Sequence, residues 1–107
     1  MDLTIELKAR SGKFQELYQA LLAFLPAMRE EKGCRDSRIY RDAEDGEIFF
    51  LSIQWDDIAA LEQYMLSNNG SAILGAIDLL GETVQVRVGN ENPWGGIEVL
   101  KRMRSKA

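Results

Sequence analysis

The stretch Glu47-Ile-Phe-Phe-Leu-Ser-Ile-Gln-Trp-Asp-Asp-Ile-Ala-Ala-Leu-Glu-Gln-Tyr-Met65 joins the strongest strand signal of the chain directly to a helix start. Side chains alternate between the two faces of a strand, so every second residue from 49 to 55 lies on one face, and that face is wholly apolar. After it, apolar residues recur at helical spacing, and Asp56 or Asp57 can cap the free amides of the first turn. The stretch therefore predicts a central strand, a cap and a helix.

The chain before this stretch predicts a strand and a long helix. Leu3, Ile5 and Leu7 alternate with polar residues, which is typical of a half-buried strand. Ser11 is expected to cap a helix that runs to about residue 32. Pro26 lies too deep in it to be a first-turn proline, so we expect a kink or break near residues 22–25.

The remaining elements complete the order strand, helix, strand, strand, helix, strand. Residues 34–42 predict a weaker strand suited to a sheet edge, and the Asp-Gly pair at 45–46 predicts a hairpin to the central strand. Residues 67–70 are expected to break the chain, Ser71 to cap a short helix, and residues 83–88 to form the last strand. This order predicts an α+β, ferredoxin-like split βαβ fold with an antiparallel sheet whose helices cover one face.

Composition excludes several classes of function. The 107 residues include no histidine and one cysteine, so imidazole catalysis, histidine-based haem or metal sites and thiolate metal sites are not expected. The net charge of −4 argues against nucleic-acid binding, because such binding depends on excess lysine and arginine. No apolar run approaches a membrane span and no signal peptide is evident, so the expectation is a cytoplasmic protein that does not bind membranes.

The second face of the predicted sheet carries apolar residues among polar ones. Ile48 and Phe50 lie in its middle, and leaving either in water costs roughly 1.5 to 3 kcal/mol. A second sheet is a reasonable cover, so we expect a homodimer formed through this face.

Two motifs resemble a known family. Arg29-Glu-Glu-Lys-Gly-Cys34 and Gln54-Trp-Asp-Asp-Ile-Ala-Ala-Leu-Glu62 are similar to the antibiotic biosynthesis monooxygenase (ABM) domain, especially its quinol monooxygenase members, and the likeness spans about residues 2 to 88. The resemblance implies a dimeric α/β barrel with a pocket between sheet and helices in each subunit. It also implies oxidation of a small aromatic phenol or quinol by O₂ without a cofactor, neither metal nor flavin, because the ionised substrate supplies the electrons.

The chain departs from this family at two positions. Tyr64 stands where quinol-oxidising relatives often carry a histidine, and Leu74 falls near the iron-ligating histidine of haem-degrading members. Haem degradation is therefore not expected.

Four residues are candidates for the site. Tyr64 is the candidate catalytic residue, which could orient or deprotonate a phenol, or simply pack with its hydroxyl at a pocket mouth. Trp55 could stack on a flat ligand or anchor the core. Arg38 could stabilise a substrate oxyanion, and Tyr18 could add a hydrogen bond.

Three functions remain open from the sequence. The first is a cofactor-independent monooxygenase acting on a small aromatic phenol or quinol, and the second is a non-catalytic dimeric module that binds a small aromatic ligand or only assembles. The third is a cofactor-free isomerase or cyclase using Glu62 or Tyr64. Residues 1–89 are expected to form the ABM-like domain, and residues 90–107 a C-terminal extension, either a short amphipathic helix or a final strand.

Overall fold

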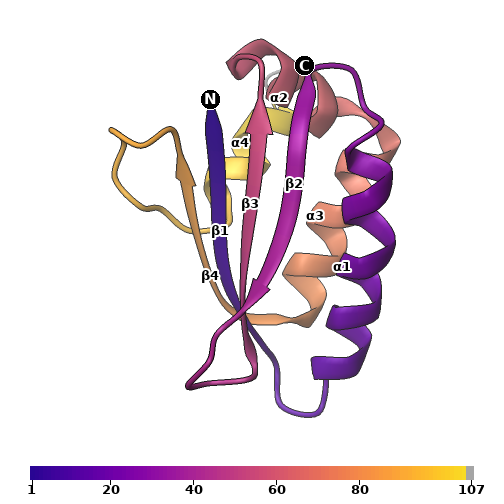
Figure 1. Cartoon of the computed structure of the whole chain (residues 1–107), viewed down its shortest axis with the longest axis vertical. Coiled ribbons are helices and arrows are strands. Elements are labelled where there is room, and N and C mark those ends of the chain that lie inside the picture. The colour runs from indigo at the N-terminus through magenta and orange to yellow at the C-terminus, as the bar shows by residue number, and fades with distance from the viewer. Residues whose placement is uncertain (106–107) are drawn as a thin grey trace.

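The computed structural model describes residues 1–105, in which the helices lie on one side of a four-stranded antiparallel sheet (Figure 1). The strands are β1 (Asp2–Ala9), β2 (Cys34–Arg41), β3 (Ile48–Trp55) and β4 (Gly81–Val88), and the helices are α1 (Phe14–Met28), α2 (Ile58–Leu66), α3 (Asn68–Leu80) and α4 (Glu98–Ser105). The sheet order is β2-β3-β1-β4, with every neighbouring pair antiparallel. This confirms the ferredoxin-like fold and the edge position of β2. The last two residues of the expected C-terminal extension lie outside the described part.

The sheet buries alternate side chains, as the sequence pattern predicts. In β1 and β3 every second side chain faces the helices, and Leu7, Phe49 and Leu51 have no exposed surface. The register places Ile5 beside Leu51 on one side and Val86 on the other, which forms a continuous apolar layer across three strands. The hydrophobic core therefore lies between this sheet face and the helices.

Helix α1 is shorter than predicted and is not interrupted where a break was expected. It begins at Phe14 after Lys13, which makes no side-chain cap, so the expected cap at Ser11 was wrong. It continues through Pro26 and ends at Met28 rather than near residue 32. Proline is tolerated here because residues 22 and 26 are both exposed, so the carbonyl of residue 22, which has no proline amide to accept from, can accept from water.

The junction between α2 and α3 is tighter than predicted. Of the two caps that the sequence left open, Asp57 is the one observed, since its carboxylate Oδ1 accepts a hydrogen bond from the Ala60 amide at 2.9 Å. Only Ser67 separates α2 from α3, and its Oγ accepts from the Gly70 amide at 3.1 Å. The break predicted over residues 67–70 is confined to Ser67, and the predicted cap at Ser71 was wrong, because a serine four residues earlier already satisfies the first turn of α3.

The C-terminal segment returns to the body of the molecule. Gly95 pairs with Val86 at the outer edge of β4, with N···O distances of 2.7 and 2.8 Å. Helix α4 then buries Leu100 and Met103, and Lys101 lies 3.0 Å from Asp78 of α3. Of the two conformations left open by the sequence, the helix is the one observed.

Within residues 1–105, no helix has the length and apolar character needed to cross a lipid bilayer.

Candidate functional site

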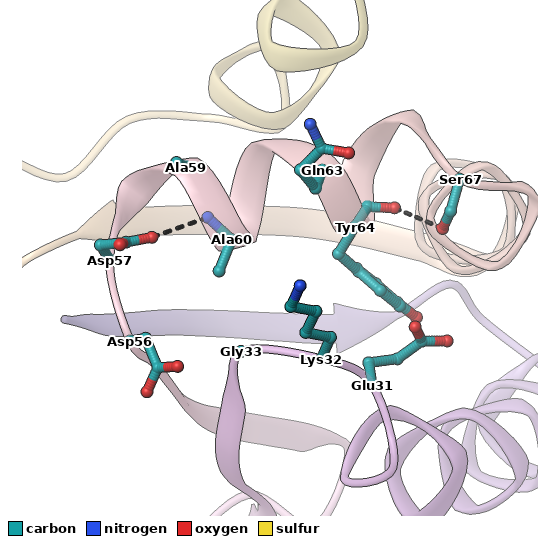
Figure 2. A pocket seen from close by; sticks show the side chains of 10 residues that line it. All are labelled: Glu31, Lys32, Gly33, Asp56, Asp57, Ala59, Ala60, Gln63, Tyr64 and Ser67. Carbon is teal, nitrogen blue, oxygen red and sulfur yellow. Dashed lines mark hydrogen bonds between the residues drawn. The ribbon is translucent and has the colours of Figure 1, made fainter.

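A groove of about 570 Å³ opens at one end of the sheet, between the loop that joins α1 to β2 and the first turns of α2 (Figure 2). Residues 31–33 of the loop form one wall, and residues from 56 to 67 form the other. The first wall lies within the first motif of the family resemblance, and the second wall includes part of the second motif, so the fold brings together segments that are distant in the sequence.

Close backbone contact holds the two walls together. The Asp56 amide donates a hydrogen bond to the Gly33 carbonyl at 2.8 Å. Gly33 has a φ of +87°, and a Cβ at this position would lie 2.5 Å from the Cβ of Ala60. Glycine is required here both for its backbone conformation and for the close approach of the loop to α2.

Several polar groups of the groove are already used by the fold. The Asp57 carboxylate caps α2, the Asp56 carboxylate lies 2.6 Å from Arg35 Nε, and the Ser67 hydroxyl joins α2 to α3. These groups stabilise the walls of the groove.

Tyr64 combines a buried ring with a polar end that borders the groove. It is 5% exposed, and its hydroxyl points toward the Glu31 carboxylate (Figure 2). Burial, together with the negative charge of Glu31, raises the pKa of Tyr64 to about 12. The phenol therefore stays protonated at neutral pH, where it is a hydrogen-bond donor and a poor base.

Trp55 lies beneath Tyr64 and forms part of the core. It has no exposed surface, and its ring centroid is 5.3 Å from that of Tyr64 at an interplanar angle of 39°. Its indole Nε1 is buried without a hydrogen-bond partner among residues 1–105.

The interior space beside these two rings is almost filled. Apolar side chains from the sheet and the helices, including Leu100 of α4, close it to a volume of about 10 Å³. That is about one water molecule at most and far less than an aromatic ring needs. In this structure the available space lies in the groove outside Tyr64 rather than between sheet and helices.

The structure brings two of the four candidate residues together and leaves the other two elsewhere. Arg38 is exposed on the sheet face opposite the helices, where its Nε lies 2.8 Å from Asp36. Tyr18 is half-buried on α1, and its ring stacks on Phe14 and Phe49 at centroid distances of 5.9 and 5.8 Å. Neither side chain lines the groove.

Sequence reasoning missed Glu31 and Asn69 as members of the site. Asn69 of α3 donates a hydrogen bond from Nδ2 to Glu31 Oε1 at 3.2 Å, which holds the carboxylate beside the groove. Glu31 belongs to the first family motif, so a signal existed, but nothing local indicates that this residue lies next to Tyr64. Within residues 1–105, no group of three or more histidine, cysteine, aspartate and glutamate side chains is arranged to hold a metal ion.

Several solved structures are similar to this chain. PA3566 from Pseudomonas aeruginosa is 25% identical, with a TM-score of 0.73 over 82% of this chain and 93% of that one. Rv0793 from Mycobacterium tuberculosis is 20% identical, with a TM-score of 0.72 over 85% and 95% of the two chains. An antibiotic biosynthesis monooxygenase of known structure is 15% identical, with a TM-score of 0.76 over 86% and 98%. The last two likenesses show the fold alone.

No curated protein matches the chain significantly. The sequence model of one family, described as antibiotic biosynthesis monooxygenase (ABM), matches residues 3–72. Because this match covers more than half of the sequence and the fold agrees with it, the chain belongs to the antibiotic biosynthesis monooxygenase family.

Proposed function

We propose that this protein is a cofactor-independent monooxygenase that binds a small aromatic phenol or quinol in the groove beside Tyr64 and oxidises it with O₂. Family membership supports the reaction type, and the groove supplies space for a ring of this size. The observation that carries the proposal is Tyr64, a protonated phenol with a buried ring whose hydroxyl lies at the edge of that groove.

The reaction balances without an added reductant. A quinol and O₂ give a hydroxyquinone and water: one oxygen atom forms a new bond to a ring carbon, and the other leaves as water. All four electrons come from the quinol. The role of Tyr64 is then to donate a hydrogen bond to a substrate oxygen and hold the ring in place, because its raised pKa disfavours a role as base.

Oxygen consumption with a naphthoquinol tests the proposal. The wild-type protein, with no cofactor added, is expected to consume O₂ faster than a protein-free control. Tyr64→Phe should lower kcat/KM by about tenfold to a hundredfold, the range for losing a hydrogen bond to a group that gains charge. Tyr18→Phe is the matched control, because it removes a tyrosine hydroxyl that lies outside the groove.

The two variants separate catalysis from folding. Equal thermal midpoints for Tyr64→Phe and the wild type would show that a loss of rate is not a loss of fold. If Tyr64→Phe turns over as fast as Tyr18→Phe, or if the wild type gives no rate above the protein-free control, the proposal is wrong.

A second function is favoured by the filled interior. The space beside Trp55 and Tyr64 that would hold a substrate between sheet and helices is closed to about 10 Å³. This is the arrangement expected of a non-catalytic module that binds a small aromatic ligand in its outer groove or only assembles. Saturable binding of the quinol without oxygen consumption would support this second function.

The proposed functional unit is a homodimer. The sheet face opposite the helices carries half-buried Ile48 and Phe50 with the exposed ring of Tyr40, and α1, α2 and α3 contact the other side. A second copy of this chain, packed face to face, is the occupant we propose for this surface.

A further inference from the structure

The Tyr64 hydroxyl has hydrogen-bonding capacity that residues 1–105 do not use. The residue is 95% buried, yet its hydroxyl makes no hydrogen bond with any residue from 1 to 105, and it borders the groove. The ring is buried, but the hydroxyl is not among the buried atoms that lack a partner, so it keeps some exposed surface and can donate to a molecule bound in the groove.

The Glu31 carboxylate lies beside this hydroxyl and is held in position. Asn69 Nδ2 donates to Oε1 at 3.2 Å. The carboxylate lies toward the end of the Tyr64 side chain (Figure 2), close enough for its charge to raise the pKa of the phenol. A carboxylate has about four lone-pair sites, so one bond to Asn69 leaves capacity to accept another.

The other charged side chains that line the groove are less suited to bind a ligand than Glu31 and Tyr64. Asp56 is paired with Arg35, and Asp57 caps α2, so both carboxylates are engaged by the fold. Lys32 also lines the groove, but it is exposed and makes no ion pair within residues 1–105.

We infer that Glu31 and Tyr64 form a recognition site for a neutral aromatic hydroxyl, which deepens the proposed function by naming the group selected. The ligand hydroxyl donates its hydrogen to the Glu31 carboxylate, and its oxygen accepts a hydrogen bond from the Tyr64 hydroxyl. A donor and an acceptor placed side by side match a hydroxyl, which is both.

The same pair discriminates against other oxygen groups. An ether or a quinone carbonyl has only acceptor lone pairs, which face the lone pairs of Glu31 and leave the carboxylate without a donor. An aromatic carboxylate is repelled by the charge of Glu31. The site thus favours the reduced quinol over its oxidised quinone and favours phenols over their methyl ethers.

Calorimetric titration with three naphthalenes of matched shape tests this inference. At neutral pH, 2-naphthol is expected to bind at least tenfold more tightly than 2-methoxynaphthalene, with 2-naphthoate weaker still. Glu31→Gln should weaken 2-naphthol about tenfold, because a charge-assisted hydrogen bond becomes a neutral one, and should leave 2-methoxynaphthalene within twofold.

Two further variants control for charge and folding. Lys32→Gln removes the groove's positively charged group and should leave the preference for the hydroxyl unchanged. Glu31→Gln keeps an oxygen that can accept from Asn69, so its thermal midpoint should match the wild type. If it does not fold, Glu31→Asp, which withdraws the carboxylate by one methylene, should give the same loss for 2-naphthol alone.

Equal affinities for 2-naphthol and its methyl ether, tighter binding of 2-naphthoate, or no binding of 2-naphthol at millimolar concentration would each overturn the inference. Its failure is distinguishable from failure of the proposed function. If binding prefers the hydroxyl and depends on Glu31, but no oxygen is consumed, the recognition site is supported and the proposed enzymatic function is wrong. If oxygen consumption depends on Tyr64, but binding shows no preference for the hydroxyl, the proposed enzymatic function is supported and the recognition site is wrong.

Discussion

Tyr64 shows how one side chain takes its properties from three different elements. Its ring packs on Trp55 at the end of β3, its hydroxyl faces Glu31 from the α1–β2 loop, and its own carbonyl accepts a hydrogen bond from Ser67. Burial and the nearby carboxylate both disfavour the phenolate, so they raise the pKa in the same direction.

This shift makes stability depend on pH in the alkaline range. The pKa of Tyr64 is about 12 in the folded protein against an ordinary value of 10, so the folded state holds the proton more tightly. The stabilisation is complete below pH 10 and is lost as the pH rises from 10 toward 12. Over that interval the free energy of unfolding should fall by on the order of 2 kcal/mol more in the wild type than in Tyr64→Phe.

Urea unfolding of both proteins at pH 9 and pH 11.5 measures this difference. Other groups titrate in the same range, and the variant carries all of them except Tyr64, so the comparison isolates one phenol. An equal loss of stability in the two proteins would show that Tyr64 ionises at its ordinary pKa.

At the scale of elements, the junction between α2 and α3 depends on a single serine. The Ser67 hydroxyl donates to the Tyr64 carbonyl, its Oγ accepts from the Gly70 amide, and its own carbonyl accepts from Arg104 at 3.0 Å. One residue therefore ends α2, caps α3 and anchors α4.

Ser67→Ala is expected to lower the free energy of unfolding by about 1 kcal/mol, the typical cost of losing a helix cap. Ser71→Ala is the matched control. Ser71 is exposed inside α3, where alanine has the higher helix propensity, so its effect should stay within about 0.5 kcal/mol. Denaturant unfolding compares the two, and an equal effect of both changes would contradict the assignment of the cap.

The elements themselves were largely predictable, while their ends were not. The alternation in β1 and β3 identifies both strands and their buried face, because strand periodicity is a local property of the sequence. The start of α3 was missed since Ser67 and Ser71 are both good caps by residue type. Which serine acts depends on how closely α2 and α3 approach, and a Cβ on Gly70 would lie only 2.8 Å from the Met65 Cα.

At the scale of the whole molecule, one face of the sheet has no cover within residues 1–105. Phe50 sits at its middle, in register with Glu6 on one neighbouring strand and Tyr40 on the other. Tyr40 is 53% exposed and lies beside the half-buried Phe50, so the two rings form an apolar patch on this face.

Phe50→Asp should dissociate the proposed homodimer, because it places a charge in the centre of the face that would be buried. A stable interface of this type buries on the order of 1,200 Å² or more. Light scattering coupled to gel filtration at micromolar concentration is expected to show a dimer for the wild type and a monomer for Phe50→Asp.

Leu79→Asp is the control, since Leu79 is 71% exposed on α3, away from this face. It should leave the dimer intact. A wild-type protein that is already monomeric at micromolar concentration would remove the homodimer from the proposed function.

The sequence alone determined the order of strands and helices up to residue 88, the buried faces of β1, β3 and β4, a cap at Asp56 or Asp57, and the family. These depend on periodicity and on residue type, which are properties of short stretches of chain. The tertiary structure decided that the interior beside Trp55 is filled and that the groove opens outside Tyr64. It also decided that Glu31, rather than Arg38 or Tyr18, lies beside the Tyr64 hydroxyl. These outcomes depend on how side chains from separate elements fill a shared volume, and no local pattern specifies that volume.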